Sequence, residues 1–283
     1  MSGGPETVAH LRSAIAGIEA EARPGRPRTP FRLPLARALD GALGGGLSGD
    51  ALHEIAPALA GDGPAAMGFA LCLAGRFCMA SSRRAPALVA SEDFCLRETG
   101  WLYGPGLAPF GLDRERLVIV NAPDGRALLW AMEEALKSGA LAVVVGELWS
   151  VARHYGLAAS RRLLLAARAG STPALLVHGG LFGQAQALSS AAETRFEITA
   201  AASRRLAPAN GRLSLPGSPT FATRLVKARL GSSAQGPPAR LFDETRIARL
   251  EWRDAETCFH DPTVPLPVVR SPADGSRARL AGP

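Results

Sequence analysis

Short apolar runs alternate with longer amphipathic stretches through the middle of the chain. The runs at 87–90, 116–120, 141–145 and 174–178 are typical of short buried strands. Between them, apolar residues recur every three or four positions, which predicts helices at 125–139 and 160–169. A further apolar helix is expected at about 64–82. Strands that alternate with helices of this length predict an α/β fold with a mainly parallel sheet covered by helices.

The two ends of the chain have different patterns. Residues 6–22 place Val8, Leu11, Ile15 and Ile18 on one helical stripe, and a proline-rich and arginine-rich linker follows. A helix with one apolar stripe needs an apolar surface to pack against, and either its own domain or a neighbouring molecule could provide that surface.

The C-terminal third is rich in predicted strands, at 194–201, at 212–215 and in a hairpin within 239–253, with basic and apolar residues alternating over 221–230. The last stretch, 261–283, is rich in proline and has no apolar period, which predicts a flexible tail. The resulting organisation is an N-terminal helix and linker (1–29), a core (30–207), a small strand-rich extension (208–260) and a tail (261–283).

Composition places the excess positive charge at the two ends. Residues 1–37 carry six basic and three acidic groups, and residues 200–283 carry thirteen and seven, within a net charge of +7. Such ends suit contact with a polyanion or an acidic partner, although solubility alone also explains them.

The cysteines and the apolar segments bound the location and the chemistry. Four cysteines without a CxxC pair predict neither a zinc site nor disulfides. The longest apolar stretch, 65–80, contains Arg76 and is short for a membrane span, so we expect a cytoplasmic protein without membrane contact. The sequence contains neither a GxSxG nor an HExxH motif, so no motif of these types suggests a hydrolase.

A glycine turn, a strand and a loop before the apolar helix have the layout of a phosphate-binding site. The turn spans 39–47, the strand 52–55, and the loop reads Gly61-Asp62-Gly63-Pro64-Ala65. A working phosphate loop needs a lysine for the phosphates and a hydroxyl for Mg²⁺, but Pro64 and Ala65 stand at these two places. Pro64 also removes a backbone donor, and Asp62 adds negative charge.

These segments, in this order, resemble the RecA-like recombinase family, and within it the ImuA-type proteins of bacterial damage-induced mutagenesis. The resemblance covers roughly residues 30–230. It rests on the glycine turn, Glu54-Ile55, Ala90-Ser91-Glu92, the strand within 139–149 and the stretch 176–198. It implies a RecA-like sheet with an N-terminal helix.

The resemblance also assigns a degenerate nucleotide site. Glu92 matches the catalytic glutamate of the family, although a carboxylate that is solvated or paired with arginine is the simpler interpretation. Gly146 stands where the metal-supporting aspartate would lie, and Glu147 would point to the other side of the strand. His178 matches a nucleotide-sensing position, or is a satisfied structural histidine. We therefore expect no ATP hydrolysis and no cofactor at a site formed by Gly61, Gly63, Pro64, Ala65, Glu92 and Gly146.

Residues 179–186 resemble the DNA-contacting loop of the family. Phe182 could stack on bases, and Gln184 and Gln186 could bond to them. The loop has no positive charge, so phosphate contacts would come from helix arginines such as Arg161 and Arg162, or from Arg153, Arg168 and Arg195.

Two segments are candidates for partner binding. The helix stripe offers Leu11, Ile15 and Ile18, and the C-terminal part offers arginine and aromatic residues of the kind found in interface hot spots. These are Arg246, Arg249, Trp252, Arg253 and Phe259.

The resemblance implies a non-catalytic accessory protein of error-prone translesion synthesis. Its partners would be a Y-family polymerase-like protein, an error-prone replicative-type polymerase and the recombinase, with single-stranded DNA as a further ligand. A DNA-dependent ATPase and a septation-inhibitor-like SOS protein remain alternatives.

Overall fold

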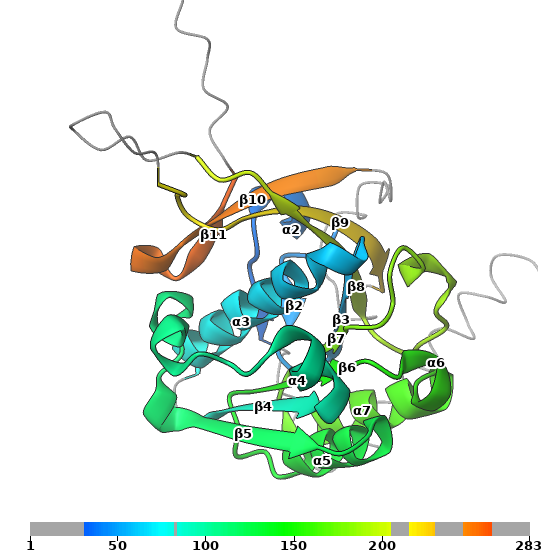
Figure 1. The fold of residues 1–283 in the computed structure, drawn as a ribbon. Coiled ribbons are helices and arrows are strands. Elements are labelled where there is room, and N and C mark those ends of the chain that lie inside the picture. The colour runs from blue at the N-terminus through cyan, green and yellow to red at the C-terminus, as the bar shows by residue number, and fades with distance from the viewer. Residues whose placement is uncertain (1–30, 82–83, 205–214, 230–245, 262–283) are drawn as a thin grey trace, which may run out of the picture.

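A nine-stranded sheet forms the centre of the protein in the computed structural model, which describes residues 31–81, 84–204, 215–229 and 246–261 (Figure 1). Its strand order is β11-β10-β9-β8-β3-β7-β6-β4-β5. The parallel strands are β3 (Leu52–Pro57), β4 (Ala87–Glu92), β5 (Leu117–Ala122), β6 (Val143–Leu148), β7 (Ala174–His178) and β8 (Thr194–Ala201). The antiparallel strands are β9 (Thr220–Ala228), β10 (Ile247–Arg253) and β11 (Cys258–His260). The predicted fold class, an α/β fold with a mainly parallel sheet flanked by helices, is confirmed.

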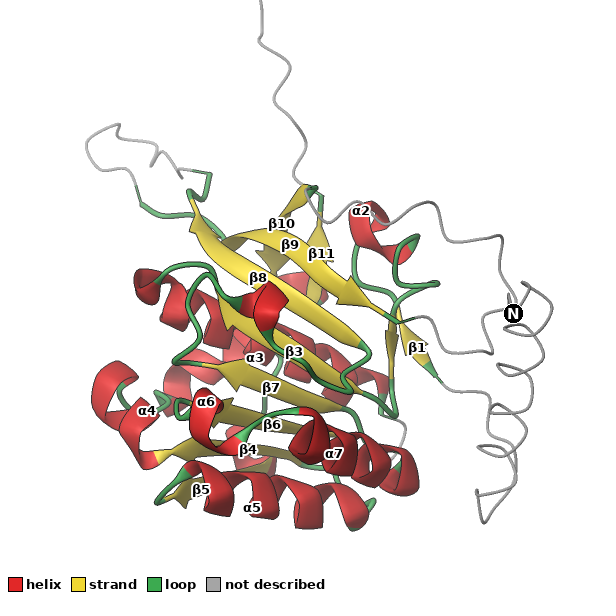
Figure 2. Ribbon diagram, turned by 90° about the vertical axis from the view of Figure 1, so that its right-hand side faces the viewer, coloured by secondary structure: helices red, strands yellow, loops and turns green. Residues whose placement is uncertain are grey.

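Helices cover both faces of the sheet (Figure 2). One face carries α3 (Gly63–Ala80), and the other carries α5 (Gly125–Lys137) and α7 (Leu157–Gly170). The shorter helices are α2 (Arg37–Asp40), α4 (Asp93–Thr99) and α6 (Val151–His154), with 3-10 turns at η1 (Ala60–Asp62), η2 (Gly104–Phe110), η3 (Arg114–Arg116), η4 (Ala185–Ala187) and η5 (Asp254–Glu256). A separate two-stranded sheet joins β1 (Arg32–Leu33) to β2 (Leu47–Ser48).

Helix α3 is apolar nearly all round because it is a core helix. Phe69 and Leu73 are fully buried, and the helix packs on β3, β6, β7 and β8. The segment Ala60–Ala80 has the length and composition of a membrane span, but more than half of it is buried against the sheet. Core packing therefore accounts for its apolar sequence.

The C-terminal strands continue the central sheet across the predicted boundary at 207/208. Phe221 and Phe259 pack on Phe69 of α3, with ring centroids of Phe69 and Phe259 at 5.1 Å, and Trp252 packs on Phe259. The Trp252 indole N–H donates to the Pro109 carbonyl at 2.8 Å, and only 1% of Trp252 is exposed. The assignment of Trp252 and Phe259 to a partner surface is therefore wrong: both belong to the core.

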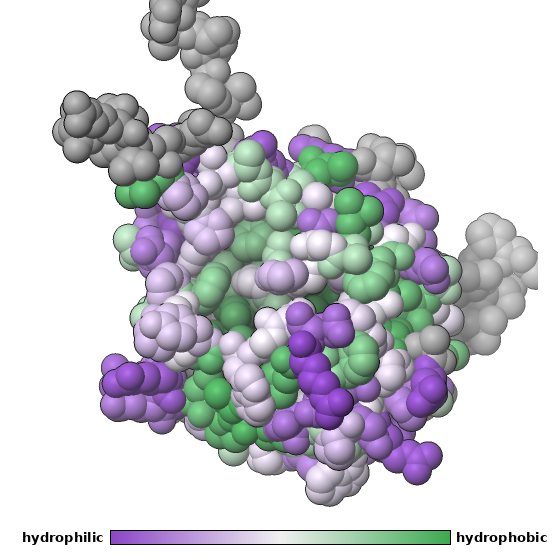
Figure 3. Space-filling model, in the orientation of Figure 1, coloured by the Kyte–Doolittle hydropathy of each residue, from purple (hydrophilic) through white to green (hydrophobic). Residues whose placement is uncertain are grey.

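Strand β5 differs from the buried strand that the sequence predicts. It is an edge strand of the sheet, and Val118 and Ile119 are exposed. Hydrophobic surface is visible in the lower part of the molecule, where β5 runs (Figure 3). The predicted helix with Leu11, Ile15 and Ile18, the strand at 212–215 and nearly all of the tail lie outside the described residues.

Candidate functional site

The carboxyl ends of β3, β4, β6 and β7 meet beside the N-terminus of α3. In open parallel sheets this edge is where ligands bind. The loop between β3 and α3 therefore lies in the position of a phosphate loop, as the sequence predicts.

The loop uses its own carboxylate to bind its backbone. Asp62 is buried; its Oδ2 accepts the Leu59 N–H at 3.1 Å, and its Oδ1 accepts the Ala200 N–H of β8 at 2.9 Å. Gly61 and Gly63 flank this carboxylate, and Pro64 and Ala65 occupy the first turn of α3. An anionic ligand would meet fixed negative charge in a loop without a lysine.

Glu92, the candidate catalytic residue, holds the turn after β6. Its Oε2 accepts the backbone N–H groups of Trp149 at 2.8 Å and Ser150 at 3.0 Å, and its Oε1 accepts the Ser150 hydroxyl at 2.7 Å. The expectation of a solvated or arginine-paired carboxylate is therefore wrong. Glu92 therefore fixes the turn after β6.

Gly146 faces away from the loop helix. A Cβ added at Gly146 would lie 2.2 Å from the Met132 sulfur of α5, so a side chain has no room there. Val143 and Val145 pack in the α3 cluster, and the alternation of a strand places Glu147 on that same face. The sequence interpretation assigned Gly146 to the nucleotide side, but Glu147 is the residue that faces α3.

Glu147 is a buried acid with few partners. Burial raises its pKa, and the Ser91 hydroxyl partly opposes that shift. A carboxyl group that is held toward its neutral form is a poor ligand for Mg²⁺.

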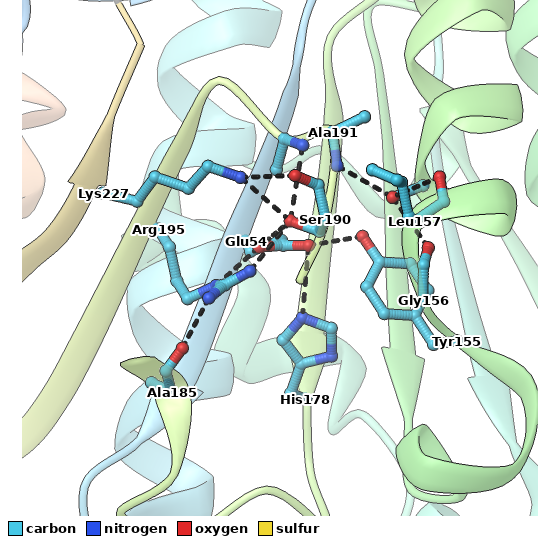
Figure 4. Close-up of polar contacts among 12 residues, drawn as sticks. Glu54, Tyr155, Gly156, Leu157, His178, Ala185, Ser190, Ala191, Arg195 and Lys227 are labelled. Atoms are coloured by element: carbon cyan, nitrogen blue, oxygen red, sulfur yellow. Dashed lines mark hydrogen bonds and ion pairs between the residues drawn. The ribbon is translucent and has the colours of Figure 1, made fainter. Parts of the chain in front are cut away.

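A buried polar cluster lies on the opposite face of the sheet, around Glu54 (Figure 4). The Arg195 Nε donates to Glu54 Oε2 at 2.6 Å, and the Ser190 hydroxyl donates to the same oxygen at 3.0 Å. The Tyr155 hydroxyl donates to Glu54 Oε1. We call Glu54, Tyr155, His178, Ser190, Arg195 and Lys227 the Glu54 cluster.

The groups around Glu54 favour its ionised form. Burial tends to raise the pKa of Glu54, but His178, Arg195 and Tyr155 outweigh it and lower the pKa to about 2. Arg195 also donates to the Ser190 hydroxyl at 2.8 Å and to the Ala185 carbonyl. Arg195 is thus fully engaged and buried, which removes it from the arginines expected to contact DNA phosphates.

His178 is not the satisfied histidine that the sequence suggested. Its ring is fully buried, and neither ring nitrogen forms a hydrogen bond within the described residues. The closest charged group is Glu54, whose Oε1 lies 3.7 Å from His178 Nε2, and the Tyr155 ring lies 5.0 Å away. The sequence offers no local signal for this cluster, because Tyr155 and Arg195 are 101 and 141 positions from Glu54.

The loop after β7 joins an aromatic group at the carboxyl edge of the sheet. Phe182 lies edge-on to Trp149 with ring centroids at 5.9 Å, and Trp149 lies 5.0 Å from Phe94 of α4. The next residue, Gly183, lies beside the Ala58 carbonyl, so Leu59 of the β3–α3 loop is close by. Leu59 is 67% exposed and Phe94 is 44% exposed. We call Phe94, Trp149 and Phe182 the aromatic edge.

The other predicted DNA-binding residues are divided between two surfaces. Gln184 and Gln186 are exposed, and Gln186 lines a pocket of about 250 Å³ with Ser189, Lys227 and Arg229. Burial lowers the pKa of Lys227 to about 8. Arg162 instead pairs with Glu133 of α5 and lines a separate groove of about 710 Å³ that includes Arg153. Arg161 is exposed on α7.

Two of the predicted C-terminal arginines, Arg249 and Arg253, lie on the outer face of β10, and the alternate residues face the core. Arg246 precedes the strand and is exposed. Arg253 approaches Glu256 at 3.4 Å, and Arg249 donates to the Ala202 carbonyl. The outer face of the strand therefore combines Arg249 and Arg253 with Ile247 and Glu251, and the aromatic side chains lie on its inner face.

Comparisons with known proteins give structural neighbours only. No family model matches the chain, and no curated protein matches its sequence. Among solved structures, the chain is similar to the RadB recombinase, with 14% identity, a TM-score of 0.46, and coverage of 81% of this chain and 98% of RadB. It is also similar to SulA from Pseudomonas aeruginosa, with 25% identity, a TM-score of 0.35, and coverage of 45% of this chain and 96% of SulA. Because both TM-scores are below 0.5, neither similarity assigns a function.

Proposed function

We propose that this chain is a non-catalytic accessory protein of DNA-damage-induced, error-prone translesion synthesis. The pathway comes from the sequence resemblance to ImuA-type proteins. In this proposal the chain bridges a Y-family polymerase-like protein and an error-prone replicative-type polymerase, and it contacts the recombinase.

One observation supports a docking role more than any other. The acidic groups near the degenerate loop are used within the chain: Asp62 binds the Leu59 and Ala200 amides, and Glu92 binds the turn at Trp149 and Ser150. Beside them the aromatic edge exposes apolar side chains where a nucleotide-binding relative would hold its ligand. Partly exposed aromatic residues on a rigid sheet edge have the character of a protein-binding hot spot.

The proposal predicts partner binding without nucleotide binding. Isothermal titration calorimetry with Mg²⁺ and ATP is expected to show no saturable binding up to about 1 mM, the upper end of common substrate affinities. Co-purification with the Y-family polymerase-like protein is expected from the full chain. Phe94→Ala should weaken that complex by about tenfold or more, because truncated aromatic hot spots cost about 2 kcal/mol.

Trp130→Ala provides the matched control. Trp130 is an exposed aromatic residue on α5, on the face opposite α3, and its removal should leave the complex unchanged. ATP turnover by the purified chain would contradict the non-catalytic assignment. If Trp130→Ala weakens the complex and Phe94→Ala does not, the aromatic edge is not the surface that binds the partner.

Contact with single-stranded DNA is a second candidate, supported by the pocket of Gln186, Lys227 and Arg229. Two cations beside an exposed amide suit a phosphate and its neighbouring base. We expect Arg229→Ala to weaken binding of an oligothymidylate, measured by fluorescence anisotropy. The slope of log affinity against log salt concentration should also fall by about one, the contribution of one phosphate contact. Arg161→Ala, on α7, is the comparison. Equal losses for both variants would point to non-specific attraction, and no binding at low salt would remove this function.

A further inference from the structure

Three side chains of different chemistry converge where β10 turns into β11. Glu256 ends η5, and Cys258 and His260 lie two residues apart on β11, so their side chains project from the same face of the strand. His260 Nε2 lies 3.0 Å from Cys258 Sγ and 2.7 Å from Glu256 Oε2. The Cys258 sulfur lies 3.6 Å from the same Glu256 oxygen. Three potential metal-ligand atoms thus lie close to one another.

Hydrogen bonding does not fully explain this convergence. The His260 Nε2–H and the Cys258 thiol can both donate to Glu256 Oε2, but the 3.0 Å contact between Nε2 and Sγ then has no proton of its own. A catalytic cysteine–histidine pair also needs the acid on the other ring nitrogen, where it orients the base. Here the acid and the thiol face the same nitrogen, and the carboxylate opposes formation of a thiolate.

A bound cation satisfies all three groups together. Thiolate sulfur, neutral imidazole nitrogen and carboxylate oxygen are the ligand types of zinc, at about 2.3, 2.0 and 2.0–2.2 Å from the metal. Tetrahedral bonds of these lengths place the donor atoms roughly 3.3–3.6 Å apart. The observed separations of 3.0, 2.7 and 3.6 Å therefore need to change by only about 0.6 Å or less.

The surroundings permit this adjustment. Glu256 and His260 are partly exposed, whereas the intervening Phe259 is buried in the core and fixes the strand. Arg253 lies 3.4 Å from Glu256 Oε1, the oxygen that does not face Cys258 and His260. Arg76 of α3 is also close enough to influence Cys258, but the Leu35 carbonyl accepts a hydrogen bond from its guanidinium at 3.2 Å. The thiolate and the carboxylate together supply two negative charges for a divalent cation.

We propose that Glu256, Cys258 and His260 form a zinc site with three protein ligands and one open coordination position. The site joins the η5 turn to β11 and thereby fastens the outer edge of the sheet. Water or a side chain of a partner can fill the fourth position. Cysteine spacing alone does not predict this site, because Cys258 has no second cysteine nearby in the sequence.

Cobalt substitution tests the ligand set directly. The full chain, freed of metal with a chelator under reducing conditions, is titrated with Co²⁺ and then with Zn²⁺. We expect one equivalent of Co²⁺ to produce a thiolate-to-metal charge-transfer band and the visible bands of a tetrahedral site, and Zn²⁺ to displace both. Zinc should also raise the melting temperature, since it binds the folded state.

Matched variants separate this site from adventitious binding. Cys258→Ser should abolish the charge-transfer band, and His260→Ala should weaken zinc binding by more than about tenfold. Cys78→Ser, which alters a half-buried cysteine of α3, should change neither. Both ligand variants alter partly exposed side chains, and circular dichroism checks that they fold. A wild-type titration without the band, or equal zinc affinity in Cys258→Ser and Cys78→Ser, would overturn the proposal.

Discussion

Arg195→Met is expected to lower the free energy of unfolding by about 3–5 kcal/mol, because it leaves the buried Glu54 carboxylate without its main cationic hydrogen-bond donor. Glu54 is fully buried, and Arg195 donates to it at 2.6 Å while also bonding Ser190 and Ala185. Urea unfolding followed by circular dichroism measures the loss. The variant should keep the fold and unfold at a lower denaturant concentration.

A double variant provides the control. Glu54→Gln together with Arg195→Met removes both charges, and much of the lost stability should return, since a neutral pair avoids an uncompensated buried charge. If the losses of unfolding free energy in the two single variants simply add in the double variant, Glu54 and Arg195 do not stabilise each other.

The same ion pair predicts how stability depends on pH. The pKa of Glu54 is about 2 in the folded chain, below its ordinary value of 4.5, so the folded state favours the ionised form. The resulting stability is fully present above the ordinary value and is lost as the pH falls toward 2. In Arg195→Met the carboxyl pKa should rise, and acid unfolding should begin at a higher pH. If the wild type and Arg195→Met have the same acid-unfolding curve, Arg195 does not stabilise the ionised form of Glu54.

The sheet could be predicted from sequence because its signals are local. Apolar runs such as 141–145 and 174–178 between amphipathic helices specify parallel strands, and β6 and β7 lie where these runs predict them. Edge position is not local information: the sequence predicts that Val118 and Ile119 are buried, but among the described residues no strand pairs with the outer edge of β5. Which strand ends the sheet depends on the topology of the whole chain.

The candidate site could be predicted only in part, for the same reason. The sequence predicts the loop at 61–65 because its residues are contiguous. The partners of Glu92 are 57 and 58 positions away, and those of Glu54 are farther still, so no sequence pattern reveals them. Gly146 shows a related limit, because strand alternation gives two faces but does not say which one a helix covers.

Burial also decides between two interpretations of the C-terminal aromatic residues. Arginine and tryptophan together suggest an interface, but alternation along β10 sends Arg249 and Arg253 outward and Trp252 into the core. Composition cannot separate a hot spot from a core residue without the direction of each side chain.

Trp252→Ala is therefore expected to destabilise the fold by about 3–5 kcal/mol, in the range of large aromatic truncations in cores. Trp252 is 1% exposed, packs on Phe259 with ring centroids at 5.1 Å, and donates its indole N–H to the Pro109 carbonyl at 2.8 Å. Thermal and urea unfolding measure the loss. Trp252→Phe keeps most of the apolar contact and loses the hydrogen bond, so it should cost less and provide a folded variant if the alanine form fails to fold.

The exposed Trp130 provides the matched comparison, since Trp130→Ala should change stability by no more than about 0.5 kcal/mol. The decisive comparison is between stability and partner binding in Trp252→Phe. Because Trp252 is a core residue, the stability of Trp252→Phe should fall while its partner affinity stays within about twofold of the wild type, since the outer face of β10 is unchanged. A variant with wild-type stability and a weakened complex would instead show that Trp252 leaves the core to contact the partner, and β10 and β11 would then have to move away from α3 when the complex forms.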